Sequence, residues 1–335
     1  MEKILVVRLS SIGDIILSTP LIRVLRRHYP QTKIHYAIKK EFASLLKHNP
    51  NVDRIIEVDN KKINTTRQVI TEEHYDWVLN IQKSHRATQL LSGVPRQKIS
   101  TYSKERLRRF LLIQFKWNFY REIKPVYQRY FEAVEQWHLV DDGLGTEVFV
   151  PSADQDHVQT ILESHFGKAK NKLVAICPGA TYANKRWTTS GFQLVIQHLI
   201  SQYHCSIVLL GGSSEIELCH EIELKINSAD ILNLAGKLTL LGSAAVLKSC
   251  QVALTNDSGL MHLAQAQKTP VVVLFGPTVK EFGFFPLPIR STVLETHLSC
   301  RPCTKMGRDE CPLGHHKCMR DISAESVWTA VADYL

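Results

Sequence analysis

Short runs of apolar and β-branched residues alternate with segments of helical periodicity along most of the chain. Runs of this kind are typical of strands buried on both faces, as in parallel sheets covered by helices, so the alternation predicts βαβ units. We expect strands at 4–8, 34–38, 54–58, 77–80, 172–177, 206–210, 231–234, 251–254 and 270–275. We expect helices at 15–28, 41–48, 60–71, 188–204, 214–227, 240–249 and 324–335, with Pro20 separating or kinking the first turn of the first one.

The alternation weakens between residues 141 and 156, where Asp-Asp-Gly-Leu-Gly and Val-Pro-Ser-Ala-Asp occur, and this predicts a domain boundary. A length of 335 residues also suits two domains. The expected fold class is α/β, with two Rossmann-like, doubly wound domains at 1–155 and 156–320 that face a cleft. The helix in residues 321–335 is expected to pack back on the first domain.

The first expected strand leads into Arg8-Leu9-Ser10-Ser11-Ile12-Gly13-Asp14, whose small residues permit a tight turn into a helix. The chain has no Gly-x-Gly-x-x-Gly fingerprint and no P-loop, so neither dinucleotide binding nor P-loop chemistry is supported. Asp14 could simply favour the helix dipole. Alternatively, a carboxylate at the carboxyl end of a strand could act as a general base toward a bound hydroxyl group.

Three further loops carry polar residues where a strand ends. Lys185 and Arg186 could neutralise a departing diphosphate, or they could be a solvated pair. Asp257, Ser258 and Gly259 open a helix, whose free N–H groups and dipole suit a phosphate, although Asp257 could instead cap that helix. Glu215 could meet a ribose or be an ordinary first-turn acid.

The ordered set of three motifs resembles a known family. The motifs are Arg8-Leu9-Ser10-Ser11-Ile12-Gly13-Asp14, Pro178-Gly179-Ala180 with Lys185-Arg186-Trp187, and Asn256-Asp257-Ser258-Gly259-Leu260-Met261-His262. Together they are similar to the ADP-heptose:lipopolysaccharide heptosyltransferases of glycosyltransferase family 9, over essentially the whole chain. The resemblance implies a GT-B fold with an acceptor-binding first domain and a nucleotide-sugar-binding second domain. It further implies inverting, metal-independent transfer of a heptose from ADP-heptose to the lipopolysaccharide inner core, with no cofactor.

The resemblance also implies roles for individual residues. Asp14 would be the catalytic base, and Lys185 would stabilise the diphosphate. The residues that would bind the donor are Ser10, Thr181, Lys185, Glu215, Leu238 at the adenine pocket, Asp257, Ser258, Gly259 and His262.

Most of the positive charge lies in one stretch. The whole chain carries +9, and residues 96–129 hold ten basic residues against two acidic ones, with aromatic residues interleaved. Such a patch suits an anionic partner, although a solvated helix face with its aromatic residues turned inward would give the same pattern. The resemblance implies an anionic inner-core acceptor, for which Lys83 and Arg86, after the expected strand at 77–80, and Lys104 and Arg108 in the basic stretch are candidates.

Four cysteines cluster near the C-terminal end, at 300, 303, 311 and 318, close to His297, His315 and His316. The Cys-x-x-Cys pair would suit structural zinc, but the later spacings form no second pair. We expect no metal, with thiols that pack a loop. Many family members that resemble heptosyltransferase II share such a tail.

No apolar run is long enough for a membrane span or a secretory signal, so we expect a cytoplasmic protein. The resemblance implies that it works at the cytoplasmic face of the inner membrane. Two alternatives stay open: a related transferase that uses another nucleotide sugar or acceptor, and a non-catalytic protein that binds anionic glycans or nucleic acid. The position of the acceptor heptose, the donor's base and the oligomeric state are not fixed by the sequence.

Overall fold

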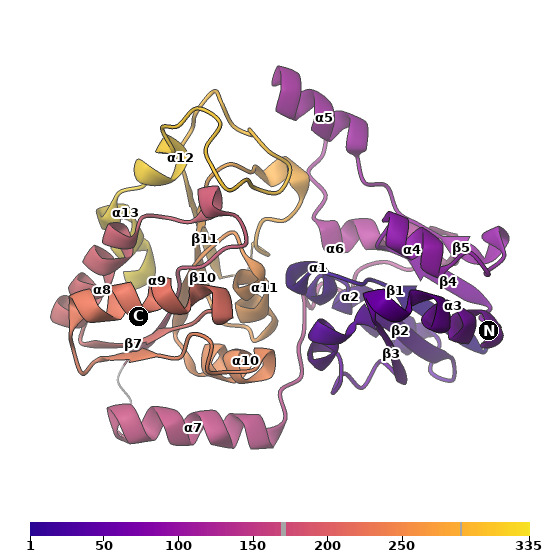
Figure 1. Cartoon of the computed structure of the whole chain (residues 1–335), viewed down its shortest axis with the longest axis horizontal. Helices are drawn as coiled ribbons and strands as arrows, with labels where there is room; N and C mark the ends of the chain where they lie inside the picture. Colours follow the sequence, from indigo (N-terminus) through magenta and orange to yellow (C-terminus); the bar gives the residue numbers. More distant parts are fainter. Residues whose placement is uncertain (169–171, 289) are drawn as a thin grey trace. The chain divides into compact units, whose positions relative to one another are not determined.

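The computed structural model describes residues 1–168, 172–288 and 290–335. The chain forms two compact units (Figure 1). Unit 1 comprises residues 1–105 and 124–149, and unit 2 comprises residues 106–123 and 150–335. The expected boundary at 155 lies near the last crossing of the chain, between residues 149 and 150, but the passage of residues 106–123 into unit 2 was not expected.

Unit 1 is built on a parallel sheet with the strand order β3-β2-β1-β4-β5. Its central strand, β1, is buried from Ile4 to Val7, as expected of a strand that is covered on both faces. Its elements in chain order are β1 (Lys3–Val7), α1 (Ile12–Ile16), α2 (Thr19–His28), β2 (Lys33–Lys39), η1 (Lys40–Leu45), β3 (Arg54–Val58), η2 (Asn60–Lys62), α3 (Ile63–Glu72), β4 (Trp77–Asn80), α4 (His85–Leu90), η3 (Arg96–Lys98), β5 (Ile99–Ser100), α6 (Val126–Arg129) and η4 (Tyr130–Trp137).

Two expected helices of unit 1 differ in form. The helix at 15–28 is divided into α1 and α2, and Pro20 lies in the first turn of α2, where its missing N–H has no helical partner to lose. The segment expected as a helix at 41–48 forms the 3₁₀ helix η1 over Lys40–Leu45.

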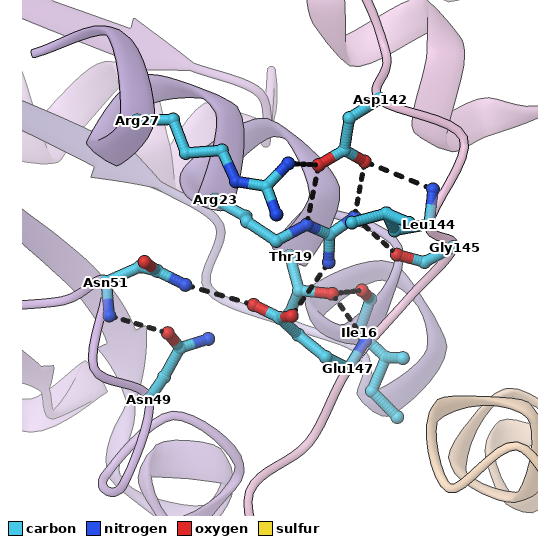
Figure 2. A network of polar contacts seen from close by, with 10 residues as sticks. All are labelled: Ile16, Thr19, Arg23, Arg27, Asn49, Asn51, Asp142, Leu144, Gly145 and Glu147. Carbon is cyan, nitrogen blue, oxygen red and sulfur yellow. Dashed lines mark hydrogen bonds and ion pairs between the residues drawn. The ribbon is translucent and has the colours of Figure 1, made fainter.

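A network of ion pairs holds the last segment of unit 1 against α2 (Figure 2). Arg23 forms a two-pronged contact with Asp142, at 2.9 Å from Nε to Oδ2 and 2.7 Å from NH2 to Oδ1. Arg23 also donates to Glu147, and Arg27 donates to Asp142, each at 2.8 Å. Glu147 in turn accepts from the Asn51 side chain at 3.1 Å. The polar sequence that predicted a linker is therefore an ordered part of unit 1 up to Glu147.

Unit 2 is built on a second parallel sheet with the order β11-β10-β9-β6-β7-β8. Its elements in chain order are α5 (Arg106–Phe115), α7 (Ser152–Phe166), β6 (Lys172–Cys177), η5 (Ala183–Lys185), α8 (Thr189–Tyr203), β7 (Cys205–Leu209), η6 (Ser213–Glu215), α9 (Ile216–Ile226), β8 (Ile231–Asn233), α10 (Leu240–Ser249), β9 (Val252–Asn256), α11 (Gly259–Ala266), β10 (Val271–Phe275), η7 (Lys280–Phe282), β11 (Ser291–Glu295), α12 (Lys317–Arg320) and α13 (Ala324–Ala332).

The C-terminal helix α13 belongs to unit 2. Val327, Ala330 and Val331 are buried in the same core as the inner residues of α8 and β10. The apolar face of α13 is therefore covered within unit 2, and the expectation that this helix packs back on the first domain stays a prediction. Among residues 1–168, 172–288 and 290–335, no helix is both long and apolar enough to cross a bilayer.

Each sheet has one switch point, where the chain stops adding strands on one side of the first strand and begins to add them on the other. In unit 1 the chain adds β2 and β3 on one side of β1 and then places β4 on the other. In unit 2 it adds β7 and β8 beside β6 and then places β9 on the other side. Ligands of doubly wound sheets bind at such switch points, beyond the carboxyl ends of the strands. The loops that follow β1, β4, β6 and β9 are therefore the places to look for a site.

Candidate functional site

The loop after β1 and the start of α1 hold a buried ion pair. Arg8 NH2 lies 2.5 Å from Asp14 Oδ1, and the two side chains are only 7% and 15% exposed. Ser11, the N-cap of α1, donates its backbone N–H and its hydroxyl to Asp14 Oδ2 at 3.3 and 3.0 Å. The Tyr130 hydroxyl donates to Oδ1 at 3.3 Å. The carboxylate of Asp14 is thus fixed by donors from three residues.

The Arg8 side chain also joins the two strands that flank the switch point of unit 1. Its NH1 donates to the carbonyl oxygen of Ile81, directly after β4, at 2.8 Å. The neighbouring backbone N–H of Leu9 donates to Gln82 Oε1 at 2.9 Å. Arg8 therefore sets the distance between the ends of β1 and β4 as well as the position of Asp14.

The charge on Asp14 is stabilised by its neighbours. Burial would raise the pKa of Asp14, but the Arg8 guanidinium and the Ser11 donors outweigh it and hold the pKa below its ordinary value. Burial raises the pKa of Tyr130, so its hydroxyl stays protonated and can donate. Asp14 is consequently an ionised carboxylate at neutral pH, as a proton acceptor must be.

A second buried ion pair lies at the switch point of unit 2. Lys185 ends η5 in the loop after β6, and its Nζ lies 2.5 Å from Oδ2 of Asp257, which follows β9. The Lys185 and Asp257 side chains are 13% and 9% exposed. The Thr278 hydroxyl, from the loop after β10, donates to the same oxygen at 2.8 Å. Three neighbouring strands therefore contribute to one charged cluster.

Asp257 does not cap the helix that follows it. The N-cap of α11 is Ser258, with extended backbone angles (φ −145°, ψ 175°), and α11 begins at Gly259. The Ser258 hydroxyl lies 3.2 Å from the Thr255 hydroxyl and makes no capping hydrogen bond to α11. The capping interpretation of Asp257 is therefore wrong, since its carboxylate is engaged by Lys185 and Thr278. The first N–H groups of α11 point out of the helix, where they suit an anion.

Asn256 holds the loop after β6 against the end of β9. Its side chain is fully buried, donates to the carbonyl oxygen of Pro178 at 2.7 Å and accepts from the backbone N–H of Trp187 at 3.1 Å. The two contacts lie on either side of Lys185 in the sequence. They fix both ends of the loop that carries the lysine.

Glu215 lies against the same loop. A Cβ atom on Gly179 would be 2.3 Å from Cγ of Glu215, and a Cβ atom on Gly211 would be 2.6 Å from its Cβ. The Glu215 carboxylate accepts from the backbone N–H of Gly212 at 2.8 Å and from the Ser214 hydroxyl at 2.7 Å. The glycines at 179 and 211 are therefore the residues that allow Glu215 to approach the switch point.

The family model for glycosyltransferase family 9 (heptosyltransferase) matches residues 63–313. The chain belongs to glycosyltransferase family 9. The match runs from α3 of unit 1 to the cysteine tail of unit 2, so it includes both loops of the charged cluster around Lys185 and Asp257. The sequence-based assignment to this family is confirmed.

Relatives within family 9 agree with this assignment. The chain is 37% identical over 160 residues to lipooligosaccharide heptosyltransferase 2 of Campylobacter jejuni, an alignment that covers 47% of this chain and 49% of the relative, so the chain spans about half of that relative's length. It is 27% identical over 356 residues to lipopolysaccharide heptosyltransferase 2 of Salmonella typhimurium, covering 97% of this chain and 96% of the relative. The solved structure of Escherichia coli ADP-heptose LPS heptosyltransferase II matches with a TM-score of 0.77 at 23% identity, over 99% of this chain and 98% of that one. That likeness confirms the GT-B fold class.

The donor-binding residues expected in unit 2 lie in the loops after its strands and at the start of α11. Lys185 and Asp257 form an ion pair in the loops after β6 and β9, and Ser258 and Gly259 directly follow Asp257 in the chain. Glu215 follows β7 and lies against Gly179 and Gly211. Thr181 is exposed in the loop after β6, and His262 is buried within α11. Leu238 precedes α10, and a Cβ atom on Gly242 would lie 3.4 Å from the Cβ atom of Leu238. In unit 1, Ser10 is half-buried beside Gln82, to which its N–H donates at 3.4 Å.

The proposed acceptor residues are only partly brought together. The Lys83 ammonium donates to the carbonyl oxygen of Tyr102 at 2.6 Å, and the Lys104 ammonium donates to the carbonyl oxygens of Gln82 and Lys83. These two lysines therefore bind two segments of unit 1 to each other. Arg86 is exposed on α4, and Arg108 is exposed on α5 of unit 2.

The cysteine tail packs against the Lys185 loop. His316 donates from Nε2 to the carbonyl oxygen of Asn184 at 2.9 Å, and the Asn184 side chain accepts from the N–H of Arg308 at 2.9 Å. Burial, followed by the nearby thiols of Cys311 and Cys300, raises the pKa of Cys303. The tail thus supports the residue next to Lys185, a role that its sequence did not indicate.

Across the described part of the chain, no three His, Cys, Asp or Glu side chains are grouped as a metal site would require. The residues that sequence reasoning missed are Tyr130, Thr278, Asn256 and His316. The position of Thr278 after the last predicted strand could have indicated it, because neighbouring strands end at one edge. No local signal could have indicated Tyr130, which reaches Asp14 across 116 positions of sequence.

Proposed function

We propose that the protein transfers a heptose from ADP-heptose to the inner core of lipopolysaccharide, with inversion at the anomeric carbon and without a metal ion. The observation that carries the proposal is the pair of charged clusters at the two switch points: an ionised carboxylate at Asp14 and an ammonium at Lys185. Family membership supports the same chemistry.

The proposed reaction assigns one task to each unit. Unit 1 supplies Asp14, which accepts the proton of the acceptor hydroxyl while the oxygen of that hydroxyl forms a bond to the anomeric carbon of the donor. The bond between that carbon and the phosphate oxygen breaks, and ADP leaves with the electron pair. Unit 2 supplies Lys185 and the N–H groups at the start of α11, which stabilise the negative charge on the departing diphosphate. A fixed ammonium and helix N–H groups can stabilise the leaving diphosphate where other transferases use a metal ion.

The remaining donor contacts are assigned by the resemblance to family 9. We assign Glu215 to the ribose and Leu238 to the adenine side, with Ser10, Thr181, Asp257 and His262 around the diphosphate and sugar. For the acceptor we assign Lys83, Arg86, Lys104 and Arg108, since an inner-core acceptor carries carboxylates and phosphates that pair with cations. The acceptor is a membrane lipid, so we also propose peripheral contact with the cytoplasmic face of the inner membrane.

Turnover of ADP-heptose with a panel of core-truncated acceptors tests the proposal. We expect ADP release and a heptosylated product that persist in excess EDTA. Asp14→Asn should lower kcat by about 10²–10⁴-fold and leave ADP binding intact, whereas Asp53→Asn in the same unit should retain activity. Near-normal turnover by Asp14→Asn would show that another group is the base.

Thermal shift with ADP, UDP and GDP distinguishes the proposed function from two alternatives, a related transferase with another donor and a non-catalytic binding protein. Stabilisation by ADP alone supports the adenine assignment, and stabilisation by another nucleotide would point to a related transferase. Salt-dependent binding to nucleic acid without any nucleotide effect would point to a non-catalytic binding protein.

A further inference from the structure

Residues 106–121 form a segment with exposed aromatic side chains to which the proposed reaction assigns no role. Phe110, Phe115, Trp117 and Phe119 are 52%, 52%, 57% and 53% exposed. Their rings follow one another, with centroid distances of 6.2, 5.1 and 6.5 Å between successive members. Single exposed aromatic residues are ordinary, but a contiguous exposed apolar patch marks an interaction surface.

The helix within this segment, α5, is amphipathic with its apolar face outward. Leu107 is 70% exposed, and Phe110 lies one turn further along the same face. The opposite face is buried at Arg109 and Leu112. Arg106 and Arg108 are exposed and, at 3.6 residues per turn, lie on either side of Leu107. An apolar ridge is therefore flanked by cations.

The segment is held firmly by unit 2. The Lys116 ammonium donates to the carbonyl oxygens of Cys300 and Pro302 at 3.0 and 2.6 Å. The Asn118 side chain donates to Glu281 at 2.9 Å, and the Arg109 guanidinium lies 5.4 Å from the centre of the Phe282 ring. The exposed rings are thus presented by an anchored support.

We propose that residues 106–121 dock the protein on an anionic phospholipid surface, with Leu107, Phe110 and Trp117 entering the headgroup region and the flanking arginines contacting lipid phosphates. Aromatic side chains favour the membrane–water interface, and basic residues near an acidic leaflet are each attracted to it. The amphipathic helix with arginines beside its apolar ridge has the pattern of an interfacial helix. The proposal names the surface that would make the membrane contact of the proposed function, and it rests on the proposed function in that respect alone. Docking itself requires neither a donor nor turnover.

Charge and side-chain type favour lipid over the other occupants. A second copy would bring two strongly basic segments together, which like-charge repulsion opposes. Nucleic acid would stack its bases on the rings, but the most exposed apolar side chain of the segment is the aliphatic Leu107, which offers no stacking face. An anionic lipid surface accommodates both the aliphatic and the aromatic side chains and pairs with the arginines.

The test is cosedimentation of the full-length protein with vesicles of phosphatidylethanolamine and phosphatidylglycerol, and with vesicles of phosphatidylcholine alone. We expect binding to the anionic vesicles and little to the neutral ones. Phe110→Ser/Trp117→Ser should weaken binding by at least about tenfold. Arg106→Gln should weaken it by about fivefold, and so should Arg121→Gln, because Arg121 is exposed at the end of the segment, two residues after Phe119. The matched control is Leu194→Ser/Leu224→Ser, which removes two exposed leucines from α8 and α9 of the same unit.

Ring insertion is read from tryptophan fluorescence. Brominated lipids should quench the wild type, and Trp117→Phe should lose most of that quenching although the other four tryptophans remain. Equal vesicle binding by the Phe110→Ser/Trp117→Ser variant would overturn the proposal. So would a loss of self-association in that variant without any vesicle binding, or binding of single-stranded DNA in preference to the vesicles.

A water-soluble, deacylated acceptor separates this proposal from the proposed function. Phe110→Ser/Trp117→Ser should transfer heptose to that acceptor at the wild-type rate while losing vesicle binding. If the wild type transfers no heptose but binds anionic vesicles through these residues, the docking surface stands and the proposed function fails.

Discussion

The guanidinium of Arg8 and the carboxylate of Asp14 lie 2.5 Å apart at the switch point of unit 1, with little of either side chain exposed. The same guanidinium donates to the carbonyl oxygen of Ile81. One side chain therefore both stabilises the charge of the proposed base and joins the ends of β1 and β4. Separating these two tasks is possible because they have different experimental signatures.

Arg8→Gln should move the acidic limb of the kcat/KM profile to higher pH. The pKa of Asp14 is held below its ordinary value of 3.8, so in the wild type Asp14 stays ionised at any pH well above that value. Without the guanidinium, burial dominates and the pKa rises. The measurement is a pH–rate profile, with Arg26→Gln, whose arginine pairs with Asp53, as the control. An acidic limb at the same pH in Arg8→Gln and in the wild type would exclude this electrostatic role.

Asp142→Asn should destabilise unit 1 at neutral pH by about 1–3 kcal/mol, because Arg23 keeps its burial and loses one of its two carboxylate partners, with only Glu147 left. The hydrogen bonds from Arg23 lower the pKa of Asp142. A lowered folded-state pKa gives stability that is present above the ordinary value of 3.8 and lost as the pH falls through the lowered value.

Urea unfolding of wild type and Asp142→Asn from pH 7 down to pH 3 measures this difference. The two curves of unfolding free energy against pH should converge toward the acidic end. A gap that is constant with pH would mean that the substitution acts through packing alone.

Asp257→Asn should bind ADP more tightly, by about tenfold, and turn over more slowly. In the ligand-free protein Asp257 neutralises Lys185, so a diphosphate must compete with a buried carboxylate for the same ammonium. The amide keeps a hydrogen-bond acceptor for Lys185 but removes the charge. Calorimetric titration with ADP gives the affinity, with Asp230→Asn elsewhere in unit 2 as the control. Weaker ADP binding would show that the carboxylate helps to hold the nucleotide.

His316→Ala should raise the KM for the donor by up to about tenfold, the value of one hydrogen bond, and change kcat less. The His316 side chain holds the carbonyl oxygen of Asn184, the residue before Lys185. The neighbouring His315→Ala offers a close comparison, because its ring accepts from the N–H of Lys317 and does not contact the Lys185 loop within the described residues. Equal KM values in the two variants would mean that the tail does not support the loop.

Gly179→Ala should lower the free energy of unfolding by about 1–3 kcal/mol, since its new Cβ would overlap Glu215. Glu215→Ala removes the overlapping Cγ, so the double variant should be less destabilised than the sum of the single ones. Gly212→Ala, which meets only the end of the Glu215 side chain at 3.3 Å, should cost little. Additive effects of the Gly179 and Glu215 substitutions would contradict the proposed contact.

Much of the fold could be predicted because buried parallel strands leave a strong local pattern. The strands at Arg54–Val58, Trp77–Asn80 and Lys172–Cys177 have the expected bounds. Helix α7 was missed because only Val158 and Leu162 of its fifteen residues are buried, which leaves little periodicity to read. Strand β11 was missed for a similar reason, since it is only half-buried along its length.

The site could be predicted as separate loops but not as clusters. Asp257 stands directly after β9, and Asp14 and Lys185 lie in the segments that follow β1 and β6, so sequence alone indicated them. Their partners come from other parts of the chain, as Tyr130 and Thr278 do, and no local pattern says which distant side chain fills a contact. The same limit explains α13, whose apolar face was recognised although its partner was not.

Unit 2 is not a continuous stretch of the chain, because residues 106–123 leave unit 1 to join it. A fragment that begins at residue 150 would lack α5, and the carbonyl oxygens of Cys300 and Pro302 would lose the ammonium of Lys116. A fragment that ends at residue 149 would carry α5 without its support, since the buried Arg109 guanidinium would lose the Phe282 ring beside it. Dissecting this protein at its apparent linker therefore yields two incomplete pieces, and during synthesis unit 2 cannot be completed from its own later residues alone.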